Sequence, residues 1–230
     1  MKNVIGEKPV RKLYGGLLAR ATFVLSKDIK NKKVLDIGCG YGWFEIYLVK
    51  RGVKKAVGLD NQKETVEIAK RYSNNKNVKF IVGDASKLPF RDSSFDTIVC
   101  WETLEHIKKE SELSFFQQVK RVLRKGGYFY LTTPYDNFIS KITDPAWVLF
   151  DHRHYSFAKL KDLGNKSGFS LEDIFRSGGY ISTMYILNWY ITKWIFRRTP
   201  FFAKFFENLS TWEYKKRSGF VNVFVKYKNE

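Results

Sequence analysis

Glycines at every second position follow a short apolar run near the beginning of the chain. The run VLDIGCGYG spans residues 34–42 and holds Gly38, Gly40 and Gly42. Glycine allows a ligand to approach the backbone closely and permits a tight turn from a strand into a helix. A dinucleotide-binding turn would place its third glycine at position 43, where this chain has Trp43. The spacing therefore predicts a ligand-binding turn and points away from NAD.

Polar residues stand at the ends of the strands that are expected next. The segment GLD ends at Asp60, and a carboxylate at this point can accept hydrogen bonds from both hydroxyl groups of a ribose. The segment GDASKLPF begins at Gly83, and FDTIVCWETLEH and LRKGGYFYLTTP occupy residues 95–106 and 123–134. Several such motifs in this order, each in a strand-turn-helix context, favour one shared ligand site, whereas a single motif would be weak evidence.

Together these motifs resemble the class I S-adenosylmethionine-dependent methyltransferases, specifically the small type 11 group that includes quinone-biosynthesis methyltransferases. The resemblance covers residues 34–134 and implies S-adenosylmethionine as co-substrate. The cofactor-binding residues that it implies are Asp36, Gly38, Cys39, Gly40, Gly42, Asp60, Asn61, Asp84, Ala85, Trp101 and Glu102. In this set the glycine run would surround the amino-acid half of the cofactor. The ribose, the adenine and the methionine part would then be contacted in turn by Asp60 with Asn61, Asp84 with Ala85, and Trp101 with Glu102.

No catalytic base is assigned by the sequence. Displacement of a methyl group from a sulfonium needs a general base only when the acceptor loses a proton during the attack. The chain has three histidines, which are weak candidates: His106, His152 and His154. His106 resembles a family position that more often braces the loop after the fourth strand. The segment DHRHY, residues 151–155, has two equally favoured roles. It could contact the substrate, or it could form a polar network at the start of a helix capped by Ser156.

The cysteines and histidines predict neither a disulfide framework nor a metal site. The chain has only two cysteines, Cys39 and Cys100, and no second pair at a ligand spacing. Both lie in apolar segments and are expected to be small buried residues rather than nucleophiles.

The periodicity of apolar residues predicts the elements that position these side chains. Five short apolar runs alternate with helices, which indicates a parallel sheet covered on both faces. Helices are expected at 13–25, 43–51, 63–72, 111–123 and 156–166, and strands at 32–38, 55–59, 78–82, 95–100, 128–133, 169–175 and, as an edge strand, 220–228. The predicted fold is a Rossmann-like, doubly wound, seven-stranded sheet, mostly parallel with an antiparallel last strand. A single methyltransferase domain would span residues 1–230.

Residues 177–217 interrupt this alternation and form a predicted helical insertion before the last strand. They hold 12 of the 39 aromatic residues, and Asn188 and Lys193 interrupt their apolar part. A spanning helix needs about 20 mainly apolar residues, so this segment is a poor transmembrane candidate. Trp and Tyr beside Lys and Arg are typical of a membrane interface. The insertion is expected either to cover the active site and touch a lipid surface, or to be a helical cap or dimer contact.

Positive charge is concentrated at the two ends of the chain. The net charge is +18, of which residues 1–33 and 176–230 each contribute +7. This distribution favours an anionic partner such as a phosphorylated metabolite, RNA or an anionic membrane, with a solvated basic surface as the alternative. Residues 1–16 hold no continuous apolar segment, so we expect a cytoplasmic protein that contacts the membrane peripherally.

The predicted function is S-adenosylmethionine-dependent methyl transfer to a small-molecule or lipid-like acceptor that the sequence does not identify. One alternative is an RNA methyltransferase or RNA-binding protein that uses the basic ends for phosphates and the aromatic side chains for stacking. Nucleic acid is the less favoured partner because no appended RNA-binding module is recognisable. A second alternative is a non-catalytic protein that keeps the cofactor-binding fold as a scaffold.

Overall fold

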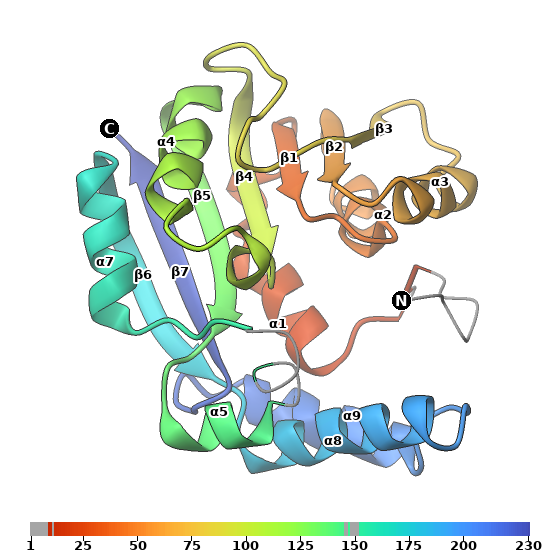
Figure 1. The fold of residues 1–230 in the computed structure, drawn as a ribbon. Coiled ribbons are helices and arrows are strands. Elements are labelled where there is room, and N and C mark those ends of the chain that lie inside the picture. The colour runs from red at the N-terminus through yellow and green to blue at the C-terminus, as the bar shows by residue number, and fades with distance from the viewer. Residues whose placement is uncertain (1–8, 11, 145–146, 148–151) are drawn as a thin grey trace.

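Seven strands form one sheet in the structure, a computed structural model that describes residues 9–10, 12–144, 147 and 152–230 (Figure 1). The strand order is β3-β2-β1-β4-β5-β7-β6. Pairs among the first five strands are parallel, whereas β7 is antiparallel to both of its neighbours. The strands are β1 (Lys33–Ile37), β2 (Lys55–Asp60), β3 (Val78–Val82), β4 (Phe95–Trp101), β5 (Leu123–Pro134), β6 (Phe169–Ser177) and β7 (Asn222–Asn229). The predicted Rossmann-like, mostly parallel sheet with an antiparallel last strand is confirmed.

Helices cover both faces of this sheet (Figure 1). Phe115 and Phe116 of α4 and Leu160 of α7 are buried in a core on one face, and Ala21 of α1 and Phe44 of α2 are buried in a core on the other. Such two-sided burial explains why the inner strands are almost entirely apolar. The helical elements are α1 (Gly15–Phe23), η1 (Ser26–Asp28), α2 (Trp43–Lys50), α3 (Lys63–Tyr72), η2 (Leu104–His106), α4 (Glu112–Val122), α5 (Phe138–Thr143), α7 (Phe157–Lys166), α8 (Tyr180–Trp194) and α9 (Ala203–Tyr214).

The expected element boundaries agree with the structure to within a few residues at most positions. The expected cap of α7 is present, because Ser156 Oγ accepts a hydrogen bond from the Lys159 amide at 3.2 Å. The largest difference is the start of β5, which was expected at Tyr128 and lies at Leu123. Leu123 pairs with Phe95 across an irregularity in the register, and an irregular pairing of this kind leaves no alternating pattern in the sequence.

The last strand is not the edge strand that its alternating sequence suggested. β7 lies between β5 and β6, and β6 forms the edge. The polar position Lys226 is buried, with its Nζ 3.9 Å from the centre of the Tyr128 ring and 3.7 Å from Asp28 Oδ2. A lysine that lies on a ring and pairs with a carboxylate can occupy a covered strand, so alternation alone did not show which strand is exposed.

The predicted insertion 177–217 contains α8 and α9, which pack against each other, and α9 also packs against α1. Glu213 of α9 accepts hydrogen bonds from the backbone amides of Ile181 (3.1 Å) and Ser182 (2.8 Å), which α8 leaves without partners at its own beginning. A carboxylate at this end also complements the helix dipole. Among the described residues, no helix is long and apolar enough to cross a membrane.

Candidate active site

A cleft of about 590 Å³, which we call the glycine cleft, opens where β1, β2, β3 and β4 end. Doubly wound sheets bind ligands at the carboxyl ends of their strands. Six of the eleven predicted cofactor residues line this cleft: Gly38, Asp60, Asn61, Asp84, Ala85 and Glu102. The fold therefore brings four of the five motifs to one place, as the resemblance implied.

Two glycines of the loop after β1 have different structural roles. Gly38 has a φ of +77°, and a Cβ atom there would lie 2.0 Å from Thr103 Oγ1 and 2.8 Å from Thr103 Cβ. Gly40 has a φ of +52°, but no atom lies within 4 Å of the position that its Cβ would take. The first glycine is thus required by contact with the loop after β4, whereas the second faces open space.

The carboxylates that line the glycine cleft are held by nearby backbone amides. Asp60 Oδ2 accepts a hydrogen bond from the Gly40 amide at 3.0 Å, and its Oδ1 accepts one from the Gln62 amide at 2.9 Å. Asp84 Oδ1 accepts one from the Ser86 amide at 2.7 Å. Because a carboxylate oxygen can accept more than one hydrogen bond, both side chains are oriented and still able to bind a ligand. Paired ribose hydroxyls and an adenine amino group fit these acceptors.

Asp36 and Cys39 lie behind the wall of the glycine cleft rather than on its surface. Burial, and then the charge of Asp60, raise the pKa of the Asp36 carboxyl, and burial followed by Asp36 raises that of Glu45. Neither carboxylate has a hydrogen-bond partner among the described residues. Burial also raises the pKa of the Cys39 thiol, so this cysteine is not a thiolate nucleophile near neutral pH.

The other predicted cofactor residues outside the cleft wall are Gly40, Gly42 and Trp101. A Cβ atom on Gly42 would lie 2.6 Å from Phe80 Cζ, so this position is crowded by the core. The Trp101 ring is buried and meets Phe44 edge to face at 5.5 Å. The cofactor contacts of these residues remain predictions.

Glu102 lies between the glycine cleft and a second cavity, because it lines both. Its φ of +48° is uncommon for a residue with a side chain. Two contacts hold it in this position: Arg20 Nη2 lies 3.1 Å from Glu102 Oε1, and Asn222 Nδ2 donates to Glu102 Oε2 at 2.7 Å. Backbone conformations of this kind are concentrated at functional sites.

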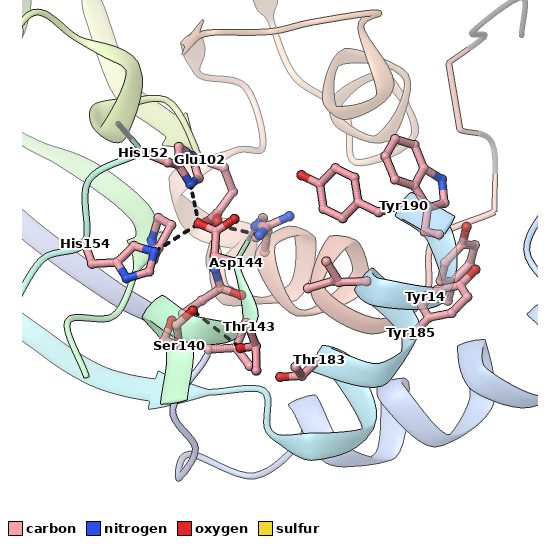
Figure 2. A pocket seen from close by; sticks show the side chains of 16 residues that line it. Tyr14, Glu102, Ser140, Thr143, Asp144, His152, His154, Thr183, Tyr185 and Tyr190 are labelled. Carbon is pink, nitrogen blue, oxygen red and sulfur yellow. Dashed lines mark hydrogen bonds and ion pairs between the residues drawn. The ribbon is translucent and has the colours of Figure 1, made fainter. Parts of the chain in front are cut away.

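The second cavity, which we call the aromatic pocket, has a volume of about 380 Å³ (Figure 2). One side is mainly apolar and aromatic, and α8 supplies most of it. The opposite side is polar and comes from the loop after β4, from Asp144 and from the segment before α7. The apolar side includes Tyr14, Tyr185, Ile186, Trp189 and Tyr190, and the polar side includes Glu102, Asp144, His152 and His154.

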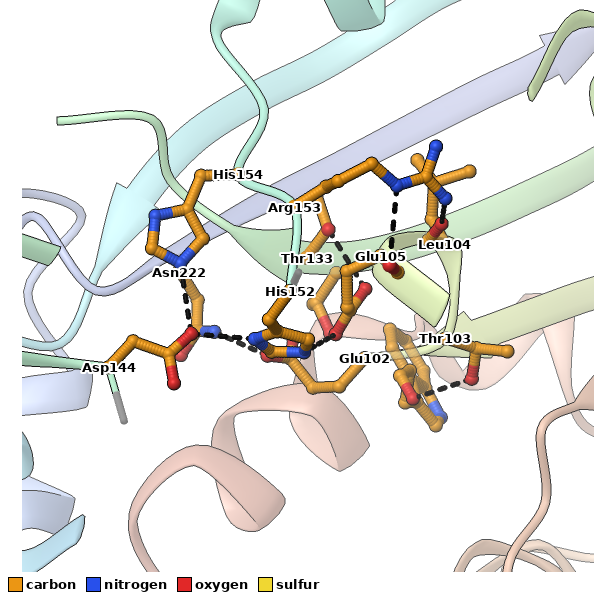
Figure 3. A network of polar contacts seen from close by, with 12 residues as sticks. Glu102, Thr103, Leu104, Glu105, Thr133, Asp144, His152, Arg153, His154 and Asn222 are labelled. Carbon is orange, nitrogen blue, oxygen red and sulfur yellow. Dashed lines mark hydrogen bonds and ion pairs between the residues drawn. The ribbon is translucent and has the colours of Figure 1, made fainter. Parts of the chain in front are cut away.

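The three histidines of the chain lie close together, and His152 and His154 line this polar side (Figure 3). Asp144 Oδ2 lies 2.6 Å from His152 Nδ1 and 3.0 Å from His154 Nε2. The His152 ring centre is 4.7 Å from that of His106, which lines the glycine cleft. Burial, and then the neighbouring His152 imidazole, lower the pKa of His106. His152 therefore connects the edges of the two cavities.

The carboxylates around the histidines complete this network. His152 Nε2 lies 3.7 Å from Oε1 of Glu105, whose Oε2 accepts a hydrogen bond from Thr133 at 2.9 Å. Burial, and then the charge of Glu102, raise the pKa of the Glu105 carboxyl. Atoms of Asp144, His152 and His154 that could bind a cation lie within 4.8 Å of one another, a grouping that the sequence did not predict. Residue 151 of the DHRHY segment lies outside the described residues.

Several residues of the site were missed by sequence reasoning. Arg20, Asp144 and Asn222 belong to no motif, and each meets its partner only through the tertiary fold. Tyr14 precedes α1 and was assigned no role, although it lines the aromatic pocket. The aromatic content of residues 177–217 was the one available signal that this region lines a cavity.

Known proteins are similar to this chain in sequence and in fold. Residues 35–131 match the methyltransferase domain family. A fatty-acid O-methyltransferase from Mycolicibacterium smegmatis is 37% identical over 107 residues, which cover 46% of this chain and 38% of that protein. A phthiotriol/phenolphthiotriol dimycocerosates methyltransferase from Mycobacterium tuberculosis is 32% identical over 154 residues, covering 61% and 53%. The chain thus spans about 38% and 53% of the length of these two curated relatives.

A solved structure gives the same assignment for the fold. The S-adenosylmethionine-dependent methyltransferase from Mesorhizobium loti superposes with a TM-score of 0.64 at 17% identity, covering 92% of this chain and 96% of that one. Strand order, glycine loop and sequence match are thus consistent with one another. Over residues 35–131, which match the methyltransferase domain family, the chain is a class I S-adenosylmethionine-dependent methyltransferase, and this family implies S-adenosylmethionine as its cofactor.

Proposed function

We propose that this protein transfers the methyl group of S-adenosylmethionine to a lipid-like acceptor. The cofactor occupies the glycine cleft in this proposal, and the acceptor occupies the aromatic pocket. The observation that carries it is the position of Glu102, which lines both cavities. Ligands in two cavities that share a side chain approach each other at that side chain, which is the arrangement that direct group transfer requires.

The apolar side of the aromatic pocket supports an acceptor with a hydrocarbon or aromatic part. Five residues there are aromatic or aliphatic: Tyr14, Tyr185, Ile186, Trp189 and Tyr190. Two relatives carry names that specify a fatty acid and phthiotriol dimycocerosates as substrates, which favours a lipid-like molecule over RNA. An anionic membrane is then the proposed source of the acceptor and the proposed peripheral location of the protein.

S-adenosylmethionine supplies a methyl group on a sulfonium that is already a good leaving group. The residues of the chain then have to orient the two ligands and exclude water. Asp60 and Asp84 would fix the nucleoside half. Glu102, held by Arg20 and Asn222, would place a negative charge near the sulfonium and the acceptor.

His152 is the proposed proton acceptor when the acceptor group is a hydroxyl. In that step the bond from sulfur to methyl breaks, the bond from oxygen to methyl forms, and the hydroxyl proton passes to the imidazole. Asp144, 2.6 Å from His152 Nδ1, would orient the ring and stabilise its charged form. An acceptor carboxylate would need no such step, so replacement of His152 separates the two acceptor classes.

Methyl transfer from labelled S-adenosylmethionine into a cell extract tests this function. The extract is separated afterwards into lipid, RNA, protein and soluble fractions, and Asp60→Ala serves as the inactive control. We expect label in the lipid fraction that depends on the wild-type protein. Label in RNA would support the nucleic-acid alternative instead, and turnover in none of the fractions would support a non-catalytic cofactor-binding protein.

A further inference from the structure

The outer side of α8 carries apolar residues where a helix in water carries polar ones. Positions 180, 184, 187, 191 and 195 are separated by three or four residues and therefore lie along one side of the helix. Ile195, just after α8, is 70% exposed, and Tyr180, Met184 and Ile191 are also exposed. We call this set of residues the outer stripe: Tyr180, Met184, Leu187, Ile191 and Ile195.

The opposite side of the same helix lines the aromatic pocket. Thr183, Ile186, Trp189 and Tyr190 all contribute to its wall. Ile186 and Trp189 are 37% and 39% exposed, so this side of α8 is partly open to solvent. A single helix thus separates the proposed acceptor site from the surface that carries the outer stripe.

Exposed phenylalanines extend the apolar surface beyond α8. Phe196 follows the helix, and Phe202 and Phe205 at the beginning of α9 are 79% and 61% exposed. Figure 1 shows α5, α8 and α9 together in the layer below the carboxyl ends of the inner strands. Phe138 of α5 is exposed in the same layer. Large apolar side chains that are exposed on neighbouring helices are typical of an interaction site.

The charge of this region is complementary to an anionic surface. Residues 177–217 contain seven Lys or Arg residues and two Glu residues. Some of the cations lie over aromatic rings: Lys193 Nζ is 4.3 Å from the centre of the Trp189 ring, and Lys216 Nζ is 3.8 Å from that of Trp212. Cations beside Trp and apolar side chains are the composition of helices that lie in a membrane interface.

We propose that the outer stripe, with the flanking phenylalanines and cations, is a docking surface for an anionic lipid bilayer. In the bound state the outer stripe lies in the headgroup region, and the aromatic pocket lies on the opposite side of α8. A second copy of the chain would be the competing occupant, but apposing two surfaces of the same positive charge is unfavourable. The inference deepens the proposed function by naming the partner surface that delivers its acceptor.

Vesicle flotation without S-adenosylmethionine or acceptor tests the docking surface separately from methyl transfer. The probes are vesicles of phosphatidylcholine alone and vesicles with about one third phosphatidylglycerol, at low and high salt. Ile191→Glu places a charge in the outer stripe, and Leu25→Glu is its matched control because the two side chains are 46% and 44% exposed. Arg197→Glu with Arg198→Glu reverses two charges, and Lys54→Glu with Lys55→Glu makes the same change where β2 begins.

We expect the wild type and both control variants to float with the anionic vesicles at low salt, and the wild type to be released by high salt. Each test variant should bind at least about tenfold more weakly while retaining the circular dichroism spectrum of the wild type. Equal losses in a test variant and its control would overturn the proposal. So would absence of binding by a folded wild type, or a dimer in sedimentation that Ile191→Glu dissociates while vesicle binding is unchanged.

Discussion

The glycine cleft and the aromatic pocket are built from the chain in different ways. The glycine cleft is formed by short motifs that end consecutive strands, so each residue is positioned by the strand that precedes it. The aromatic pocket joins the segment before α1, the end of α5, the segment before α7, α8 and the beginning of β7, which are distant in the sequence. Cofactor binding is therefore local in the sequence, whereas acceptor binding depends on tertiary packing.

The largest expected effect concerns the glycine cleft. Asp60→Ala should weaken binding of S-adenosylmethionine about a hundredfold or more, because two hydrogen bonds to a charged acceptor contribute roughly 1.5–3 kcal/mol each. Isothermal titration calorimetry measures this, with Asp162→Ala as a control in which an exposed carboxylate of α7 is removed. Unchanged affinity in a folded Asp60→Ala protein would show that the ribose is bound elsewhere.

Two glycine substitutions separate folding from ligand binding within the same loop. Gly38→Ala forces a Cβ atom against Thr103, so we expect a loss of about 2–4 kcal/mol in the free energy of unfolding. Gly40→Ala meets open space and should lose only about 1 kcal/mol from its positive φ. Its affinity for S-adenosylmethionine should nevertheless fall, because the added methyl group occupies ligand space. Equal losses of stability in urea titrations would contradict this difference.

A substitution in the aromatic pocket should weaken acceptor binding and leave cofactor binding unchanged. Trp189→Ala removes part of its apolar wall, so the KM for a lipid-like acceptor should rise about tenfold. The Kd of S-adenosylmethionine should not change. Tyr72→Ala, an exposed ring at the end of α3, is the control and should leave both constants unaltered. A weaker cofactor affinity in Trp189→Ala would indicate that the two cavities are not separate.

The smallest expected effect is a change in pH dependence. Because the pKa of Glu45 is raised, its proton is held more tightly in the folded state than in the unfolded state. The stability from this group is present below the ordinary glutamate pKa of about 4.3 and is lost as the pH rises through the raised pKa. Glu45→Gln should therefore reduce the decline in unfolding free energy that follows as the pH rises, with exposed Glu64→Gln as control. If the unfolding free energy of Glu45→Gln declined as steeply with pH as that of the wild type, the titrating group would be another residue.

The contrast between the two cavities also explains what the sequence could predict. Gly38, Asp60 and Asp84 were found because a strand followed by glycine or a carboxylate is a local pattern. Arg20 and Asn222 were not found, because their contacts to Glu102 form only when α1 and β7 pack beside the loop after β4. The burial of β7 was missed for a related reason, since Lys226 is accommodated by Asp28 and Tyr128 from other elements.

A crystal structure with S-adenosylmethionine bound tests the central claim, that the two cavities meet at Glu102. We expect the ribose at Asp60, the adenine at Asp84, and the sulfonium methyl beside Glu102, directed toward the aromatic pocket. A methyl group directed away from that pocket, or a wall of protein between the methyl group and the pocket, would show that the two cavities do not form one active site.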